Sequence, residues 1–169
     1  MDKGKLCIIF NPAAKGERAR LLETKVAALA ETSKMFCSSQ PGDAERLARA
    51  AVAQGFEIIV AAGGDGTLNE VVNGIAGSGA TLGLLPLGTM NVFAEELGLP
   101  VNQLAACWEI ILSGQTRGVD FAQNETNDRS VELHHFGGAG HRSPGAFIAN
   151  PSSDGRQTEG RFILIGNGK

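Results

Sequence analysis

The sequence predicts a doubly wound α/β fold with a mostly parallel sheet, followed by an incomplete second all-β domain. Short apolar runs alternate with stretches of helical period up to about residue 113. These runs are apolar throughout rather than alternating with polar residues, as expected for strands covered on both faces. Glycine, proline and asparagine end several of the runs. Alternating strands and helices of this kind favour one sheet with helices on its two sides.

The first elements follow from local signals. The apolar run LCIIF predicts a strand at residues 6–10, which ends at Asn-Pro because proline cannot continue a ladder. Leucine, valine and alanine recur at helical spacing over residues 17–32. A strand at residues 34–38 and a helix from residue 43 to a C-capping Gly55 come next.

The same alternation continues through the next part of the chain. A strand is predicted at residues 57–62 and a helix at residues 67–75. A further strand at residues 81–88 precedes a short helix over residues 91–97 and a longer one over residues 102–114.

The pattern changes beyond that helix. Residues 115–123 predict a strand that leads away from the sheet, and residues 160–166 predict another strand. Residues 124–153 show neither period, and disorder is an open alternative for the segment up to residue 159. We therefore predict an α/β domain at residues 1–118 and a partial C-terminal β-sandwich at residues 119–169.

Composition narrows the classes of function. The net charge of −3 gives little electrostatic support for a nucleic-acid partner. No apolar run approaches the roughly 20 residues that span a bilayer, so we expect a cytoplasmic protein without a transmembrane segment. Cys7, Cys37 and Cys107 are far apart and lack CxxC spacing, which favours neither a zinc site nor a disulfide framework.

Three turns are expected at the carboxyl edge of the sheet, where ligands of parallel sheets collect. They are NPAAKG, GGDGT and PLGTMN, at residues 11–16, 63–67 and 86–91. Glycines can take positive φ and allow backbone N–H groups to approach an anion closely. The helix that follows GGDGT points its positive end at the same place. These turns therefore predict a phosphate site.

Side chains in these turns extend the prediction. Thr67 and Thr89 offer hydroxyl donors, and Lys15 offers a cation. Asp65 would repel phosphates unless it holds Mg²⁺, accepts a proton from an attacking hydroxyl, or braces the loop through hydrogen bonds. The sequence leaves these three roles open. It contains neither a GxxxxGK[ST] P-loop nor, in AGGDGT, a GxGxxG dinucleotide motif.

In this order and spacing, NPAAKG, GGDGTLNEVVNG and LPLGTMNVFAEELGLP closely resemble the catalytic domain of diacylglycerol and sphingosine kinases, above all the bacterial ones. The resemblance covers residues 5 to about 120. It implies a two-domain enzyme in which ATP with Mg²⁺ donates its γ-phosphoryl group to a lipid hydroxyl. Because such a lipid lies in a membrane, the expected cytoplasmic protein would also bind peripherally to the membrane surface. NAD kinases share GGDGT and a similar N-terminal domain, so an NAD kinase-like phosphotransferase is an alternative.

The resemblance also implies site residues. Asp65 is the candidate catalytic residue. The implied nucleotide contacts are Asn11, Lys15, Gly16, Ser38, Gly63, Gly64, Asp65, Gly66, Thr67, Asn69, Glu70 and Thr89. The family favours Thr at the position of Ser38, and a bracing or solvated role for Glu70 is an equal alternative. Many members have Asp at the position of Val92. The valine in this chain removes one candidate for organising Mg²⁺, and the metal ligands stay open.

The later part of the chain departs from the family. A complete sandwich domain would supply the acceptor-binding half of the cleft and a further acidic group, so a nucleotide-binding fragment without catalysis is a third hypothesis. His141, Arg142 and Ser143 replace an expected Ile-Asp, and we hypothesise a local frame displacement over residues 141–153. A metal site at His134, His135 and His141 is less favoured than solvated loop histidines. The lipid, the oligomeric state and the activity of these 169 residues alone stay open.

Overall fold

The structure is a computed structural model of the 169-residue chain. It describes residues 5–12, 17–30, 33–101, 103–123, 131–132 and 157–163. The hypothesised frame displacement at residues 141–153 lies outside the described residues, and so do His134, His135 and His141.

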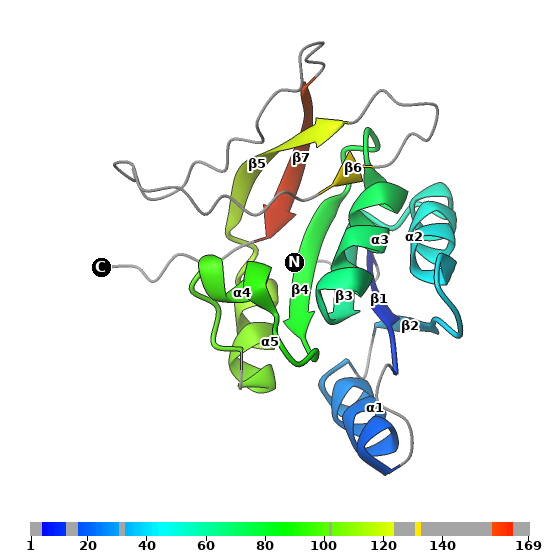
Figure 1. Ribbon diagram of the computed structural model, residues 1–169, viewed down its shortest axis with the longest axis vertical. Coiled ribbons are helices and arrows are strands. Elements are labelled where there is room, and N and C mark those ends of the chain that lie inside the picture. The colour runs from blue at the N-terminus through cyan, green and yellow to red at the C-terminus, as the bar shows by residue number, and fades with distance from the viewer. Residues whose placement is uncertain are drawn as a thin grey trace.

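Four parallel strands form the centre of the fold (Figure 1). They are β1 (Leu6–Phe10), β2 (Lys34–Cys37), β3 (Ile58–Gly63) and β4 (Thr81–Pro86), and their order in the sheet is β2-β1-β3-β4. The predicted strands and the parallel pairing are confirmed. Because parallel neighbours need a crossover, helices connect these strands.

Helices cover both faces of this sheet. They are α1 (Glu17–Leu29), α2 (Asp43–Ala53), α3 (Asp65–Ile75), α4 (Val92–Glu96) and α5 (Leu104–Ser113). Buried residues of α2, α3 and α4 pack on one face, and those of α1 and α5 on the other. The predicted doubly wound α/β architecture is therefore confirmed.

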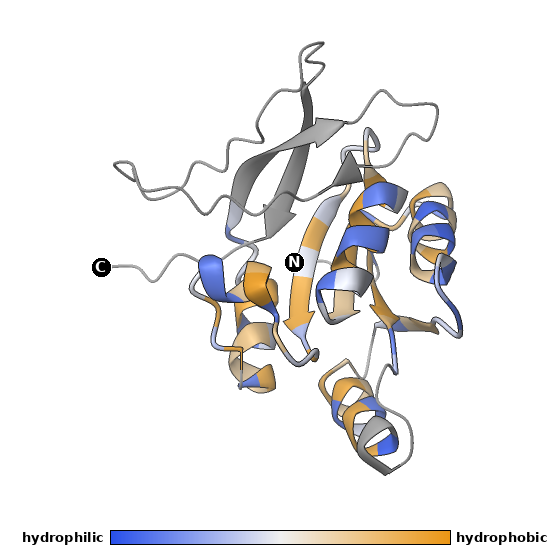
Figure 2. Cartoon of the chain, in the orientation of Figure 1, coloured by the Kyte–Doolittle hydropathy of each residue, from blue (hydrophilic) through white to orange (hydrophobic). Residues whose placement is uncertain are grey.

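The side chains of β1 show why the strands are apolar throughout. Leu6, Ile8 and Phe10 belong to the core with α1 and α5, whereas Cys7 and Ile9 belong to the core with α2 and α3. All five are buried. Full burial of one such aliphatic side chain contributes roughly 1.5–3 kcal/mol. In Figure 2, β4 is mostly orange, while blue residues lie on the helices and turns around it.

The helix after GGDGT begins earlier than predicted. It starts at Asp65 instead of Thr67, since Gly64 adopts an extended conformation (φ −93°, ψ −171°) and serves as its N-cap. The Leu68 N–H donates to the Gly64 carbonyl at 3.0 Å, which places the first helical hydrogen bond at the glycine turn itself. An aspartate in the first turn also suits the helix dipole. Asp65 is therefore part of the helix, not of a loop before it.

Three later strands join the same sheet. β5 (Thr116–Gln123) pairs antiparallel with β7 (Gln157–Ile163) and with β6 (Val131–Glu132), and β7 pairs parallel with β4. The prediction that the strand after α5 leads away from the sheet is therefore wrong. β7 lies between β4 and β5, with Arg161 and Phe162 paired to β4 and the whole strand paired to β5. The predicted domain boundary at residue 118 falls within β5 and stays a prediction.

Within the part of the chain that the structure describes, no helix has the length and apolar character needed to cross a bilayer.

Candidate functional site at the carboxyl edge of the sheet

Backbone hydrogen bonds align the ends of the three central strands. The Asn11 N–H donates to the Ala62 carbonyl, and the Leu87 N–H donates to the Gly63 carbonyl, both at 2.9 Å. Each bond continues the ladder one step beyond a strand end. The start of NPAAKG, the turn GGDGT and the turn PLGTMN therefore lie side by side, as the sequence predicted for ligand-binding turns.

The two glycine turns pack directly against each other. A Cβ atom built on Gly88 would lie 2.5 Å from the Gly64 Cα, and one built on Gly64 would lie 3.2 Å from the Gly88 Cα. Neither glycine has positive φ, and the same holds for Gly63 and Gly66. The expected use of positive φ is thus wrong for GGDGT. Glycine is needed at Gly64 and Gly88 because the two backbones approach too closely for side chains.

Thr67 links the first turn to α3. Its hydroxyl oxygen accepts a hydrogen bond from the Asn11 side-chain amide at 2.9 Å. Thr67 is buried, and Asn11 is half-buried. A Cβ on Gly63 would lie 2.4 Å from the Thr67 Oγ1, so the turn closes over this hydroxyl. Asn11 and Thr67 therefore fix the first turn against the second.

Asp65 braces the two glycine turns. One carboxylate oxygen accepts the Val92 N–H at 3.1 Å, and the other accepts the Phe93 N–H at 3.2 Å. The N-cap residue of α4, Asn91, makes no side-chain capping bond, so Asp65 satisfies the first amides of α4 from a neighbouring helix. Of the three roles that the sequence left open for Asp65, bracing is the one visible in these contacts.

Asn91 is a residue that the sequence reasoning missed. Its φ of 49° makes it the only residue other than glycine with positive φ among the residues that the structure describes. Its Oδ1 accepts the Gly88 N–H at 2.9 Å, and its Nδ2 donates to the Gly88 carbonyl at 2.7 Å. Asparagine tolerates the left-handed conformation better than most residues, which is the signal that could have identified it.

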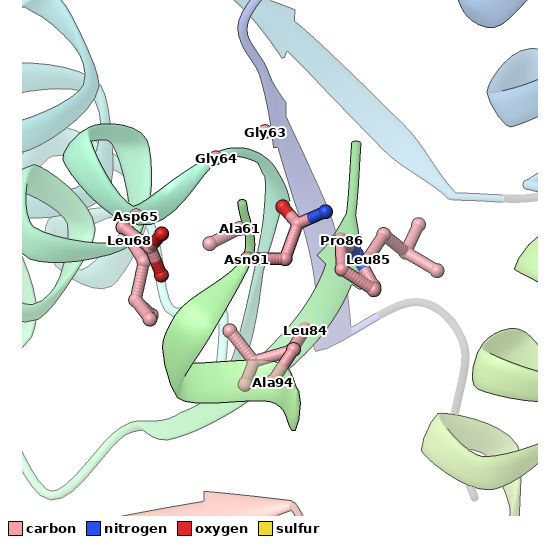
Figure 3. Close-up of a pocket in the computed structure, with 10 residues that line it drawn as sticks. All are labelled: Ala61, Gly63, Gly64, Asp65, Leu68, Leu84, Leu85, Pro86, Asn91 and Ala94. Atoms are coloured by element: carbon pink, nitrogen blue, oxygen red, sulfur yellow. The ribbon is translucent and has the colours of Figure 1, made fainter. Parts of the chain in front are cut away.

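Asp65, Asn91 and the glycine turn surround one small cavity (Figure 3). Its volume is about 10 Å³, enough for about one water molecule. A phosphate group therefore does not fit between the two turns. Gly66, in the first of them, is exposed.

The amino end of α3 has open amides. Its N-cap Gly64 provides no side-chain capping bond, and the first N–H groups of any α-helix lack partners within the helix. A Cβ atom on Gly66 would have nothing within 4 Å, so this part of the turn is accessible. Asp65 is half-buried, Gly66 is exposed and Thr67 is buried, so the positive end of the helix dipole is most accessible at Gly66. By contrast, the first amides of α4 are occupied by Asp65.

Glu70 points to α2. Its Oε2 accepts the Ala44 N–H at 3.0 Å. The N-cap of α2 is Gly42, which has no side chain to cap the helix, and Glu70 supplies that acceptor from α3. The bracing alternative for Glu70 is the one seen in the described contacts.

Ser38 is buried beside the end of β1, at the start of an otherwise exposed turn. Its N–H donates to the Phe10 carbonyl at 2.9 Å. Next to it, Asp43 accepts hydrogen bonds from the Ser39 hydroxyl at 2.7 Å and the Ser39 N–H at 3.0 Å. These bonds, together with the Arg46 guanidinium at 3.1 Å, hold the pKa of the Asp43 carboxyl well below its usual range.

The other predicted contacts vary in position. Thr89 is exposed in the PLGTMN turn, and Asn69 is half-buried on α3. Lys15 and Gly16 lie outside the described residues. Within the described ranges, no group of three or more His, Cys, Asp or Glu side chains could hold a metal ion.

The three cysteines are free. Cys7 and Cys107 are buried, and burial raises their pKa values to about 12 and about 11. Cys37 is exposed at the end of β2, which β1 separates from β3 and its glycine turn.

Glycine turns and an open helix amino terminus at the carboxyl edge of a parallel sheet are typical of α/β domains that bind phosphate groups. Residues 5–124 match the family described as "Diacylglycerol kinase catalytic domain". The chain therefore belongs to this family, and the predicted family resemblance is confirmed.

Individual proteins similar to this chain support the same family. The chain is 39% identical over 123 residues to a diacylglycerol kinase of Bacillus subtilis (strain 168), covering 69% of this chain and 40% of the relative. It is 36% identical over 124 residues to a diacylglycerol kinase of Staphylococcus saprophyticus, with the same coverage of 69% and 40%. A crystal structure of a diacylglycerol kinase from Bacillus anthracis str. Sterne is similar with a TM-score of 0.61 and 28% identity, covering 72% of this chain and 47% of that one. The chain thus spans about two fifths of the length of these curated relatives.

Proposed function

We propose that this chain carries the nucleotide-binding part of an ATP-dependent lipid kinase that phosphorylates the hydroxyl of a diacylglycerol-type lipid. One observation carries the proposal. The two glycine turns are locked together at the carboxyl edge, and α3 presents accessible amides beside them while those of α4 are capped by Asp65. Membership of the diacylglycerol kinase family supplies the reaction class.

In this proposal the phosphates of ATP bind the amides of residues 65–67. The Thr89 hydroxyl, exposed in the neighbouring turn, donates to a phosphate oxygen, and Lys15 supplies a cation. Asn11 and Thr67 act mainly by holding the first turn in place. Ser38 and Asn69 are proposed to lie at the margin of the nucleotide.

The residues at this edge fit a Mg²⁺ ion that arrives with the nucleotide. Mg²⁺ is commonly bound by substrate phosphates and one or two carboxylates instead of a cage of protein ligands. Asp65 would be that carboxylate, because each of its oxygens keeps a further lone pair beyond the amide it accepts. When bound, the ion neutralises charge on the phosphates.

The reaction itself is a phosphoryl transfer. The lipid hydroxyl oxygen attacks the γ-phosphorus, the bond from that phosphorus to the bridging oxygen breaks, and ADP leaves. The hydroxyl proton must pass to a base, and Asp65 is not free for this step while its two oxygens accept the α4 amides and it holds the ion. The chain's own contribution is mainly positioning and charge stabilisation by backbone amides. The acceptor would be reached at a membrane surface, through peripheral contact.

Phosphoryl transfer by the 169-residue chain tests this proposal. The chain would be incubated with γ-labelled ATP, Mg²⁺ and a short-chain diacylglycerol in mixed micelles, with NAD as a competing acceptor in a parallel reaction. Label in the lipid supports the proposal. Label in NAD would favour the NAD kinase-like alternative, and ATP binding without label in either acceptor would favour a nucleotide-binding fragment. Absence of ATP binding would contradict all three.

A further inference from the structure

We propose that Asn91 is a positioning residue of the nucleotide site, and that it acts by locking the turn at residues 88–90 against the glycine turn of α3. This inference rests on the proposed function, since it assigns the residue that shapes one wall of the phosphate site. Neither sequence pattern nor family membership assigned a role to Asn91.

The first observation is conformational. Asn91 holds a left-handed backbone conformation, with φ 49° and ψ 43°. Such a conformation is uncommon outside glycine, and it turns the chain sharply between the loop and α4. The residue is only 9% exposed, so its side chain is committed to the interior of the turn. A strained and buried residue at this place needs compensating contacts.

The second observation is that the side chain bonds both backbone groups of one residue. The Oδ1 accepts from the Gly88 N–H at 2.9 Å, and the Nδ2 donates to the Gly88 carbonyl at 2.7 Å. A side-chain amide carries an acceptor and a donor on two atoms of one planar group, which is what these two bonds require. Together the two bonds join Asn91 to Gly88 and so hold the two ends of the turn at residues 88–91 together.

The third observation connects this turn to the phosphate site. Gly88 is the residue that touches Gly64, with its built Cβ only 2.5 Å from the Gly64 Cα. Gly64 is in turn the N-cap of α3, whose amides form the proposed phosphate cradle. The residue after Gly88 is Thr89, which is exposed and proposed to contact a phosphate. Asn91 therefore sets the position of Thr89 relative to α3 without touching the nucleotide itself.

The two substitutions that separate these contributions are Asn91→Gly and Asn91→Ala. Asn91→Gly keeps the left-handed backbone accessible and removes both bonds to Gly88. Asn91→Ala removes the bonds and also strains the backbone. Ile59→Val serves as the control, because Ile59 is buried near the amino end of β3, away from the turn, and its truncation loosens the core only.

Two readouts are measured on the 169-residue chain. The first is amide hydrogen exchange of Gly88 by NMR without nucleotide. We expect Asn91→Gly to speed this exchange at least about tenfold, while amides of β3 and β4 keep their protection. The second is the dissociation constant for Mg-ATP by calorimetry. We expect it to rise about tenfold in Asn91→Gly, at least as much in Asn91→Ala, and to stay at the parent value in Ile59→Val.

The outcomes separate the lock from the proposed function. Unchanged Gly88 exchange in Asn91→Gly would overturn the lock whether or not the chain binds ATP. Faster exchange with unchanged ATP affinity would overturn the positioning role and leave the proposed function standing. If Asn91→Gly exchanges faster but the parent chain binds no ATP, the proposed function is refuted, and the positioning role with it. Faster exchange together with weaker ATP binding, absent from Ile59→Val, supports the inference.

Discussion

Replacement of Gly66 by alanine should raise the stability of the chain and weaken its binding of Mg-ATP. Gly66 is exposed in the first turn of α3, and a Cβ built there has nothing within 4 Å. Its backbone is helical, so alanine is not strained at this position. Alanine is favoured over glycine in helices by up to about 1 kcal/mol, which here predicts a melting temperature about 1–4 °C higher.

The same methyl group would stand where a phosphate must approach the amides. A tenfold rise in the dissociation constant corresponds to about 1.4 kcal/mol. With a parent dissociation constant near 1 mM, about 10 mM Mg-ATP stabilises the parent by about 1.4 kcal/mol. For Gly66→Ala the same concentration would stabilise by only about 0.4 kcal/mol. The assay is thermal unfolding with and without Mg-ATP, supported by calorimetric titration.

Gly74→Ala is the matched control, since Gly74 lies in the same helix. A Cβ on Gly74 would lie 2.5 Å from the Glu45 carbonyl oxygen and 2.6 Å from the Ala48 Cβ, where α3 crosses α2. We expect this variant to lose about 1–3 kcal/mol of stability through overpacking and to keep the ATP-induced shift. If Gly66→Ala kept the parent affinity for Mg-ATP, the assignment of the phosphates to the start of α3 would be refuted.

Three further substitutions test other contacts at this edge. Asp65→Asn should cost about 1–3 kcal/mol in urea unfolding, because its amide group must face one of the two α4 amides that the carboxylate accepts; unchanged stability would argue against the brace. Glu70→Ala should cost about 0.5–2 kcal/mol by uncapping α2, with Mg-ATP affinity retained; weaker affinity at unchanged stability would instead favour direct contact with the nucleotide. Because the folded-state pKa of Asp43 lies below its unfolded value near 3.9, its contribution is present at neutral pH and is lost as pH falls below about 4. Asp43→Asn should therefore flatten the acid limb of stability against pH, and an unchanged limb would contradict the role of the Ser39 bonds.

The sequence predicted the central fold well because its signals are local and repeated. Fully apolar strands such as LCIIF can only be buried on both faces, and the helical periods between them left one sensible arrangement. The late strands were harder to place. Pairing of β7 between β4 and β5 depends on partners far apart in sequence, which no local period encodes.

The candidate site shows a similar division. The glycine turns predicted where phosphates would collect, yet the reason for glycine at Gly64 and Gly88 is close contact between two turns instead of positive φ. Asp65 and Glu70 were recognised as notable carboxylates, but their partners are backbone amides of other helices, which sequence does not reveal. The sequence placed Asn91 in the PLGTMN turn but gave it no role, because that role depends on a backbone conformation.

The most direct test of the phosphate cradle is a heteronuclear NMR titration of the isotopically labelled chain with Mg-ATP. We predict that the largest changes in amide chemical shift occur at residues 65–67, with further changes at Thr89, and that they saturate with a single dissociation constant. Two results would contradict the account. One is a set of saturable changes confined to amides elsewhere in the chain. The other is no change up to about ten times the expected dissociation constant, a concentration at which binding would stabilise the fold by about 1.4 kcal/mol.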